Sequence, residues 1–149
     1  MPQDPSAAVS PLPFVLQLHP AGRRADQVFA RQAGNGLTLP QFIVLQVLAE
    51  GSGPSQTEIM TATGIDRSSV ADLVKRLVKY GWVQRRRTKG DARVYAVRLT
   101  KEGERILALG IPAARASEQF LLYSFSAGER RVLLKALLTL ANDNRSSIE

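Results

Sequence analysis

Apolar residues recur at helical spacing along most of this chain, and the pattern begins at Pro13. The first apolar segment runs to about residue 33 and is followed by Gly34-Asn35-Gly36, which suits a left-handed helix end. Pro20 lies inside this segment and cannot donate a hydrogen bond to the carbonyl of Leu16. We therefore expect one long helix with a kink or a break at Pro20.

Three later helix starts share the capping-box pattern, in which a hydroxyl residue precedes Gln or Glu by three positions. They are Thr38-Leu39-Pro40-Gln41, Ser55-Gln56-Thr57-Glu58 and Ser126-Ala127-Gly128-Glu129. Each opens an apolar segment, which predicts helices from 38 to about 50, from 56 to 63 and from 127 to 141. Asp66 is placed to cap a further helix, whose apolar positions form one face: Val70, Leu73, Val74, Leu77 and Val78.

After Gly81 the hydrophobic period changes from a helical one to two. This change predicts two strands, joined by a turn at Lys89-Gly90-Asp91. From Thr100 the helical period returns and continues to about residue 122, with Pro112 expected to bend the helix.

The order of short helix, glycine turn, amphipathic helix and two-stranded hairpin is typical of a winged helix-turn-helix. The predicted fold class is mainly α with a small β-hairpin wing. We expect a flexible N-terminal tail over 1–12, the winged helix-turn-helix over 37–103, and a helical dimerisation region over 13–36 and 104–149. The first and last helices carry apolar residues on more than one stripe, which favours a homodimer. The alternative is a helical bundle within a single chain.

Positive charge is concentrated in one quarter of the chain. The whole chain carries +7, whereas residues 64–101 contain eleven Lys and Arg against three Asp, a net of +8. The remainder therefore sums to −1. A cluster of this kind predicts a polyanionic partner, and double-stranded DNA is the foremost candidate.

The composition also excludes several kinds of site. No cysteine is present, which removes disulfides, thiolate metal sites and cysteine chemistry, and His19 is the sole histidine. Because no metal-ligand, nucleotide-binding or nucleophile motif occurs either, we expect no metal, no cofactor and no enzyme activity. The chain lacks an apolar run of the roughly 18 residues that would cross a bilayer. It also lacks a signal peptide, so we expect a cytoplasmic protein without membrane contact.

The helix after Asp66 is the predicted recognition helix. Its candidate DNA-binding residues occupy the first turn or lie off the apolar face: Arg67, Ser68, Ser69, Asp72, Lys75 and Arg76. Arg67 suits a bidentate contact to guanine, and Asp72 can accept from cytosine N4. The alternative is a solvated face on which Asp66 and Ser69 serve only as a helix cap.

The hairpin contains further basic residues, among them Arg85, Arg86, Arg87, Lys89 and Arg93. The candidate DNA-binding residues of the wing are Arg86, Arg87, Lys89, Asp91 and Arg93. An arginine at a wing tip suits the narrow minor groove, and we assign that place to Arg93. Asp91 is expected to pair with an arginine of the wing or recognition helix, or else to act only as a turn residue.

From Phe14 to Asn142 the sequence resembles the MarR family of bacterial transcriptional regulators. The matching segments are Leu37–Leu45, Leu77–Arg85, the D-x-R pattern Asp91-Ala92-Arg93 and the L-T-x-x-G pattern from Leu99 to Gly103. The resemblance implies an intertwined homodimer, minor-groove insertion of Arg93 and a bracing role for Asp91. Two departures are Lys89, where the family commonly has proline, and Pro20 in the first helix.

Members of this family commonly bind small aromatic acids between the dimer helices and the DNA-binding lobe. For an anionic aromatic effector, the candidates here are His19 and Arg23, four residues apart, with Phe42 and Trp82 as apolar walls. The alternative for His19 is a capped or solvated residue beside Pro20. Because the chain has no cysteine, it cannot sense oxidants through cysteine oxidation.

These observations predict a sequence-specific transcriptional regulator, a repressor that binds a palindromic operator as a homodimer. A small metabolite, an aromatic carboxylate, would release it. The alternative is an architectural or constitutive DNA-binding protein without an effector. A regulator should prefer its palindrome roughly 10³-fold over random DNA, and an architectural protein should not.

Overall fold

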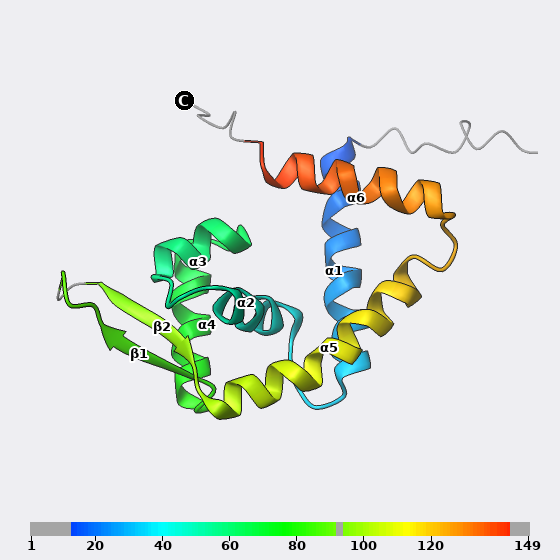
Figure 1. Ribbon diagram of the computed structural model, residues 1–149. Helices are drawn as coiled ribbons and strands as arrows, with labels where there is room; N and C mark the ends of the chain where they lie inside the picture. Colours follow the sequence, from blue (N-terminus) through cyan, green and yellow to red (C-terminus); the bar gives the residue numbers. More distant parts are fainter. Residues whose placement is uncertain (1–12, 92–93, 144–149) are drawn as a thin grey trace, which may run out of the picture.

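The computed structural model of the chain describes residues 13–91 and 94–143. Within these ranges it contains six helices and one antiparallel pair of strands: α1 (Phe14–Ala33), α2 (Leu39–Glu50), α3 (Gln56–Thr63), α4 (Arg67–Lys79), β1 (Val83–Arg87), β2 (Tyr95–Leu99), α5 (Lys101–Leu121) and α6 (Ala127–Ala141). Figure 1 shows a lobe formed by α2, α3, α4 and the two strands, with the long helices α1 and α5 beside it. The predicted mainly helical fold with a hairpin wing is confirmed.

All three predicted capping boxes are present. At the start of α2, the hydroxyl of Thr38 accepts from the backbone N–H of Gln41, and the Gln41 side chain accepts from the N–H of Thr38. The boxes that open α3 and α6 have the same reciprocal pair of bonds. Because a capping box satisfies backbone donors locally, it fixes a helix start without help from the rest of the fold.

Pro20 does not break the first helix. α1 is continuous from Phe14 to Ala33, so the expectation of a break was wrong. The reason lies in exposure, because Leu16 and Pro20 both face solvent in this chain. Water can satisfy the Leu16 carbonyl that loses its helical partner at Pro20. α5 likewise continues through Pro112.

The sheet is held against the lobe by one residue of each strand. Val83 of β1 and Val97 of β2 are buried, and the backbone N–H of Val97 also donates to the carbonyl of Pro54 at 3.0 Å. In the antiparallel register, Val83 lies opposite Leu99 and Arg85 lies opposite Val97. This register decides which wing arginines face the helices.

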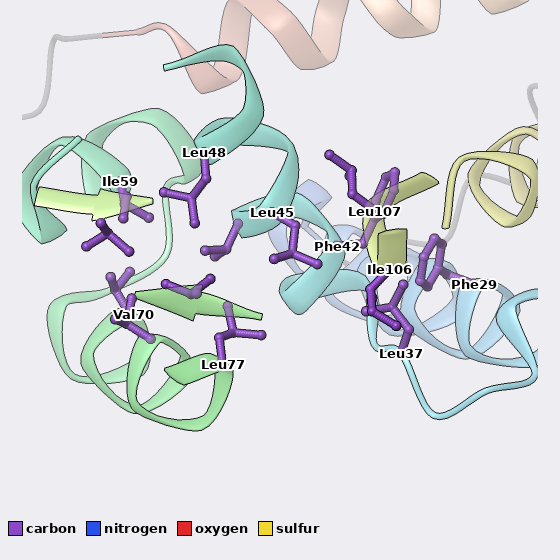
Figure 2. Close-up of a cluster of buried hydrophobic side chains, with 14 of the residues drawn as sticks. Phe29, Leu37, Phe42, Leu45, Leu48, Ile59, Val70, Leu77, Ile106 and Leu107 are labelled. Carbon is purple, nitrogen blue, oxygen red and sulfur yellow. The ribbon is translucent and has the colours of Figure 1, made fainter. Parts of the chain in front are cut away.

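The hydrophobic core is continuous, and α2 runs through its middle (Figure 2). On one side of α2, Leu45 and Leu48 pack with buried residues of α3 and α4. On the other side Phe42 lies against Phe29 of α1, with ring centroids 5.2 Å apart. A Cβ on Gly110 of α5 would lie only 2.6 Å from the Phe42 ring, so glycine lets α5 approach α2 closely.

α6 buries none of its side chains within the described chain. Its exposed apolar residues include Val132 at 70%, Leu134 at 59% and Leu138 at 53% of full exposure. Figure 1 shows this helix apart from the lobe and the sheet. No helix in the described ranges combines the length and the apolar character needed to span a bilayer.

Candidate nucleic-acid interface

α4 has one packed face and one polar face. Val70, Val74 and Leu77 are almost fully buried against the lobe. The opposite face is exposed and carries three basic residues and one acid, namely Asp72, Lys75, Arg76 and Lys79, while Arg67 is exposed in the first turn. This is the arrangement that a helix needs in order to pack on its domain and enter a major groove.

A small cluster of polar groups caps the start of α4. The carboxylate of Asp66 accepts from the backbone N–H of Ser69 at 3.0 Å, from the Ser69 hydroxyl at 2.7 Å and from the Ser68 hydroxyl at 2.9 Å. These bonds, led by those from Ser69, lower the pKa of the Asp66 carboxyl to about 2. Asp66 therefore stays ionised at any pH at which the protein would meet DNA.

The cap limits what the two serines can contact. Because a carboxylate only accepts hydrogen bonds, both hydroxyls must act as donors to Asp66. In this arrangement they offer only lone pairs to a DNA base, and a phosphate oxygen would need a donor. Ser68 is exposed, whereas Ser69 is half-buried. Of the two predicted contacts, Ser68 is therefore the better placed.

The wing arginines lie on two opposite faces of the sheet. Residues directly opposite each other in an antiparallel pair share a face, and neighbours along a strand alternate. Arg85 pairs with the buried Val97 and Arg87 pairs with Tyr95, so both lie on the face that packs on the helices. Arg86 pairs with Ala96 and lies on the other face.

A hollow of about 420 Å³ lies between the recognition helix and the wing. It brings together Arg67 of α4 and Arg85 of β1, and it is completed by Ser55, Gln56, Thr57, Val94 and Tyr95. Beside it, the guanidinium of Arg87 lies 5.9 Å from the centre of the Tyr95 ring. Arg85 was missing from the predicted DNA-binding residues, although counting in twos from the apolar Val83 would have put it on this face.

The tip of the wing is described up to Asp91. Lys89 is exposed, and the Thr88 hydroxyl donates to the carbonyl of Asp91 at 3.0 Å. Arg93, the predicted minor-groove residue, lies outside the described residues. The predicted ion pair of the Asp91 carboxylate stays a prediction.

Hydrogen bonds and a close backbone contact connect the start of α5 to the residues that follow α4. The Thr100 hydroxyl donates to the carbonyl of Gly81 at 2.6 Å and accepts from the N–H of Gly103. The N–H of Thr100 donates to the carbonyl of Trp82 at 3.0 Å. A Cβ on Gly103 would overlap that same carbonyl, so only glycine fits there. The L-T-x-x-G pattern therefore holds the segment that follows β2, where the chain leaves the wing, against the segment before β1, where the chain enters it.

The four predicted effector residues do not meet in one place. His19 and Arg23 line a shallow hollow on α1, together with Val15, Leu18, Gly22 and Asp26. Phe42 is buried against Phe29, and the ring of Trp82 lies 5.0 Å from that of Tyr80. A separate apolar hollow of about 280 Å³ lies between α1 and α5, beside Phe29 and Leu39.

A recognition helix with an exposed basic face, set beside a basic two-stranded wing, defines a winged helix-turn-helix DNA-binding protein. The sequence profile of the MarR family matches residues 35–94. The transcriptional repressor NicR of Pseudomonas putida is 32% identical over 131 residues, which cover 87% of this chain and 83% of NicR. The chain belongs to the MarR family of transcriptional regulators.

Solved structures agree with this assignment. The repressor CouR bound to a 23-mer DNA duplex is 30% identical, with a TM-score of 0.77 over 87% of this chain and 92% of CouR. BpsR of Bordetella bronchiseptica, whose DNA binding is regulated by 6-hydroxynicotinic acid, shares the fold. It has a TM-score of 0.79 and is 24% identical, over 86% of this chain and 98% of BpsR.

Proposed function

We propose that this regulator is a repressor that binds a palindromic operator as a homodimer and is released by a small aromatic acid. The observation that carries the proposal is the exposed basic face of α4 beside the wing arginines. In the proposed complex α4 enters the major groove and the wing lies along the adjacent minor groove. Arg93 is the proposed minor-groove residue, on the strength of its place in the D-x-R pattern.

The operator is tested by selection from a random double-stranded DNA library. The selection is run at ~150 mM salt, close to physiological ionic strength, with excess competitor DNA. We expect an inverted repeat with half-site centres about 10 bp apart, one helical turn. Recovery without any motif would favour an architectural DNA-binding protein and contradict the proposed regulator.

The proposed dimer is supported by the apolar residues that the single chain leaves exposed on α6. Leu134 and Leu138 are one helical turn apart and line the same hollow, so they belong to one face. A purely intrachain bundle would bury such a face, and the described chain does not. A second copy of the chain would cover it.

Replacing both Leu134 and Leu138 with glutamate is expected to halve the mass measured by sedimentation and to abolish tight operator binding. The fold of each chain should persist, because both side chains are exposed in the single chain. The matched control is the double substitution by methionine, which keeps the face apolar and should leave the dimer intact. A glutamate variant that still sediments as a dimer would show that α6 is not the interface.

The proposed effector is an aromatic carboxylate, for which His19 and Arg23 supply a donor and a cation in one hollow. BpsR, which has the same fold, is a protein whose DNA binding is regulated by an aromatic carboxylic acid, 6-hydroxynicotinic acid. The ligand can act only if it binds better to the protein geometry that does not fit DNA.

We expect 6-hydroxynicotinic acid or benzoate to displace a labelled operator in a fluorescence anisotropy titration. Arg23→Ala should raise the half-displacing concentration about tenfold or more, the loss expected for a charged hydrogen bond. Arg31→Ala, which removes an exposed α1 arginine outside that hollow, should leave it unchanged. If no aromatic acid displaces the operator, the effector proposal fails while the DNA-binding proposal stands.

A further inference from the structure

The hollow between α4 and the wing joins two cationic side chains that are far apart in the sequence. Arg67 occupies the first turn of α4, and Arg85 lies on the inward face of β1. The remaining lining residues described, Ser55, Gln56, Thr57, Val94 and Tyr95, include no acid. Two guanidinium groups with hydroxyl and amide groups around them form a site for an anion with several acceptor oxygens.

The position of the hollow shows which anion of DNA would reach it. In the proposed complex α4 enters the major groove and the wing follows the adjacent minor groove. One strand of the sugar–phosphate backbone separates these two grooves. That strand must cross between α4 and the wing, where the hollow lies.

We propose that Arg67 and Arg85 together hold a single phosphate of this backbone strand. Arg67 is then a positioning residue, and it does not read guanine as the sequence suggested. This assignment rests on the proposed function and deepens it. It leaves the reading of bases on α4 to Ser68, Asp72, Lys75 and Arg76, which are exposed and lie outside this hollow.

The shared phosphate makes a quantitative prediction. The logarithm of affinity falls with the logarithm of salt concentration by about one unit for each phosphate neutralised. Arg67→Ala and Arg85→Ala should each weaken binding about tenfold, the loss expected for a charged hydrogen bond, at every operator sequence alike. The double variant should lose about one unit of salt slope, since only one phosphate is released. If the two arginines held two independent phosphates, the double variant would lose about two units of salt slope.

Affinities of full-length protein for the selected operator are measured by fluorescence anisotropy at several salt concentrations. The matched control is Arg86→Ala, which removes the same charge from the opposite face of β1. Combined with Arg67→Ala, it should give fold-losses that multiply, because the two residues share no contact. The Arg67→Ala/Arg85→Ala pair should instead lose less than the product of its single variants.

The phosphate itself is located with operators that carry one neutral methylphosphonate at a time. We expect one position in each half-site at which wild-type protein loses about tenfold in affinity and the double variant loses nothing. Relaxed preference at one base pair in Arg67→Ala, with an unchanged salt slope, would identify Arg67 as a base reader and overturn the proposal. Multiplicative losses for the Arg67/Arg85 pair would also overturn it.

Two further outcomes separate the inference from the proposed function. If inorganic phosphate stabilises the wild-type protein against heat but not the double variant, and no methylphosphonate position matters, the hollow binds a free anion and the backbone assignment is wrong. If the wild-type protein shows no operator preference at all, the proposed regulator fails and the inference fails with it. Operator binding that survives in both single variants without loss contradicts the inference alone.

Discussion

Replacing Gly103 with alanine is expected to destabilise the protein by about 3 kcal/mol or more, at the upper end for an overpacked site. The added methyl group would occupy the place of the Trp82 carbonyl oxygen, which already accepts from the N–H of Thr100. The Trp82 carbonyl and the Thr100 N–H are both backbone groups, so there is no flexible side chain that can move aside. The entrance and exit of the wing would have to separate, and operator affinity should fall as well.

The Gly103→Ala effect is measured by thermal unfolding at a fixed protein concentration, because dimerisation makes the midpoint depend on concentration. The matched control is Gly22→Ala in α1, where a Cβ meets nothing within 4 Å. That change should stabilise the helix by about 0.5–1 kcal/mol, since alanine favours helix more than glycine does. Equal effects at the two glycines would show that the Trp82 contact imposes no constraint.

Phe29→Ala is expected to cost about 3–5 kcal/mol, the range for removal of a buried phenylalanine. Phe29 is 1% exposed and packs on Phe42, where α1, α2 and α5 converge. For a chain of this length, such a loss corresponds to a fall of roughly 6–20 °C in melting temperature.

The comparison that isolates the cavity is Phe29→Leu, which keeps most of the apolar volume and should cost clearly less than alanine. Both variants are followed by calorimetry and by circular dichroism at one protein concentration. A loss below about 1 kcal/mol for Phe29→Ala would be typical of an exposed site and would contradict the packing described here.

The helix starts could be predicted because their determinants are local. Thr38, Ser55 and Ser126 each bond a residue three positions away, so a short stretch of sequence contains the whole interaction. The starts of α3 and α6 followed from these boxes and agree with the structure. A break at Pro20 was wrongly allowed beside a kink, because the effect of a proline depends on whether the freed carbonyl reaches water, and that is a property of the fold.

The candidate site was harder to predict because it depends on register and on contacts between distant segments. Three consecutive arginines, Arg85 to Arg87, carry no hydrophobic alternation from which a face can be read directly. Counting in twos from the apolar Val83 indicates the inward face for Arg85, but it is the pairing of β1 with β2 that shows Arg85 inward beside Val97 and Arg86 outward. The effector residues show the same limit, since a spacing of four relates His19 to Arg23 but cannot relate either to Trp82.

The continuous core around α2 has a consequence for how the protein unfolds. Phe42 and Leu45 lie three residues apart on one helix, yet they pack on the long helices and on the recognition helix respectively. Neither half of the core is complete without the other, so the described chain should melt in a single cooperative transition. A fragment limited to residues 37–103 would lose the apolar cover that α1 and α5 supply. The winged helix-turn-helix and the long helices α1 and α5 should therefore fold and unfold together as one cooperative unit.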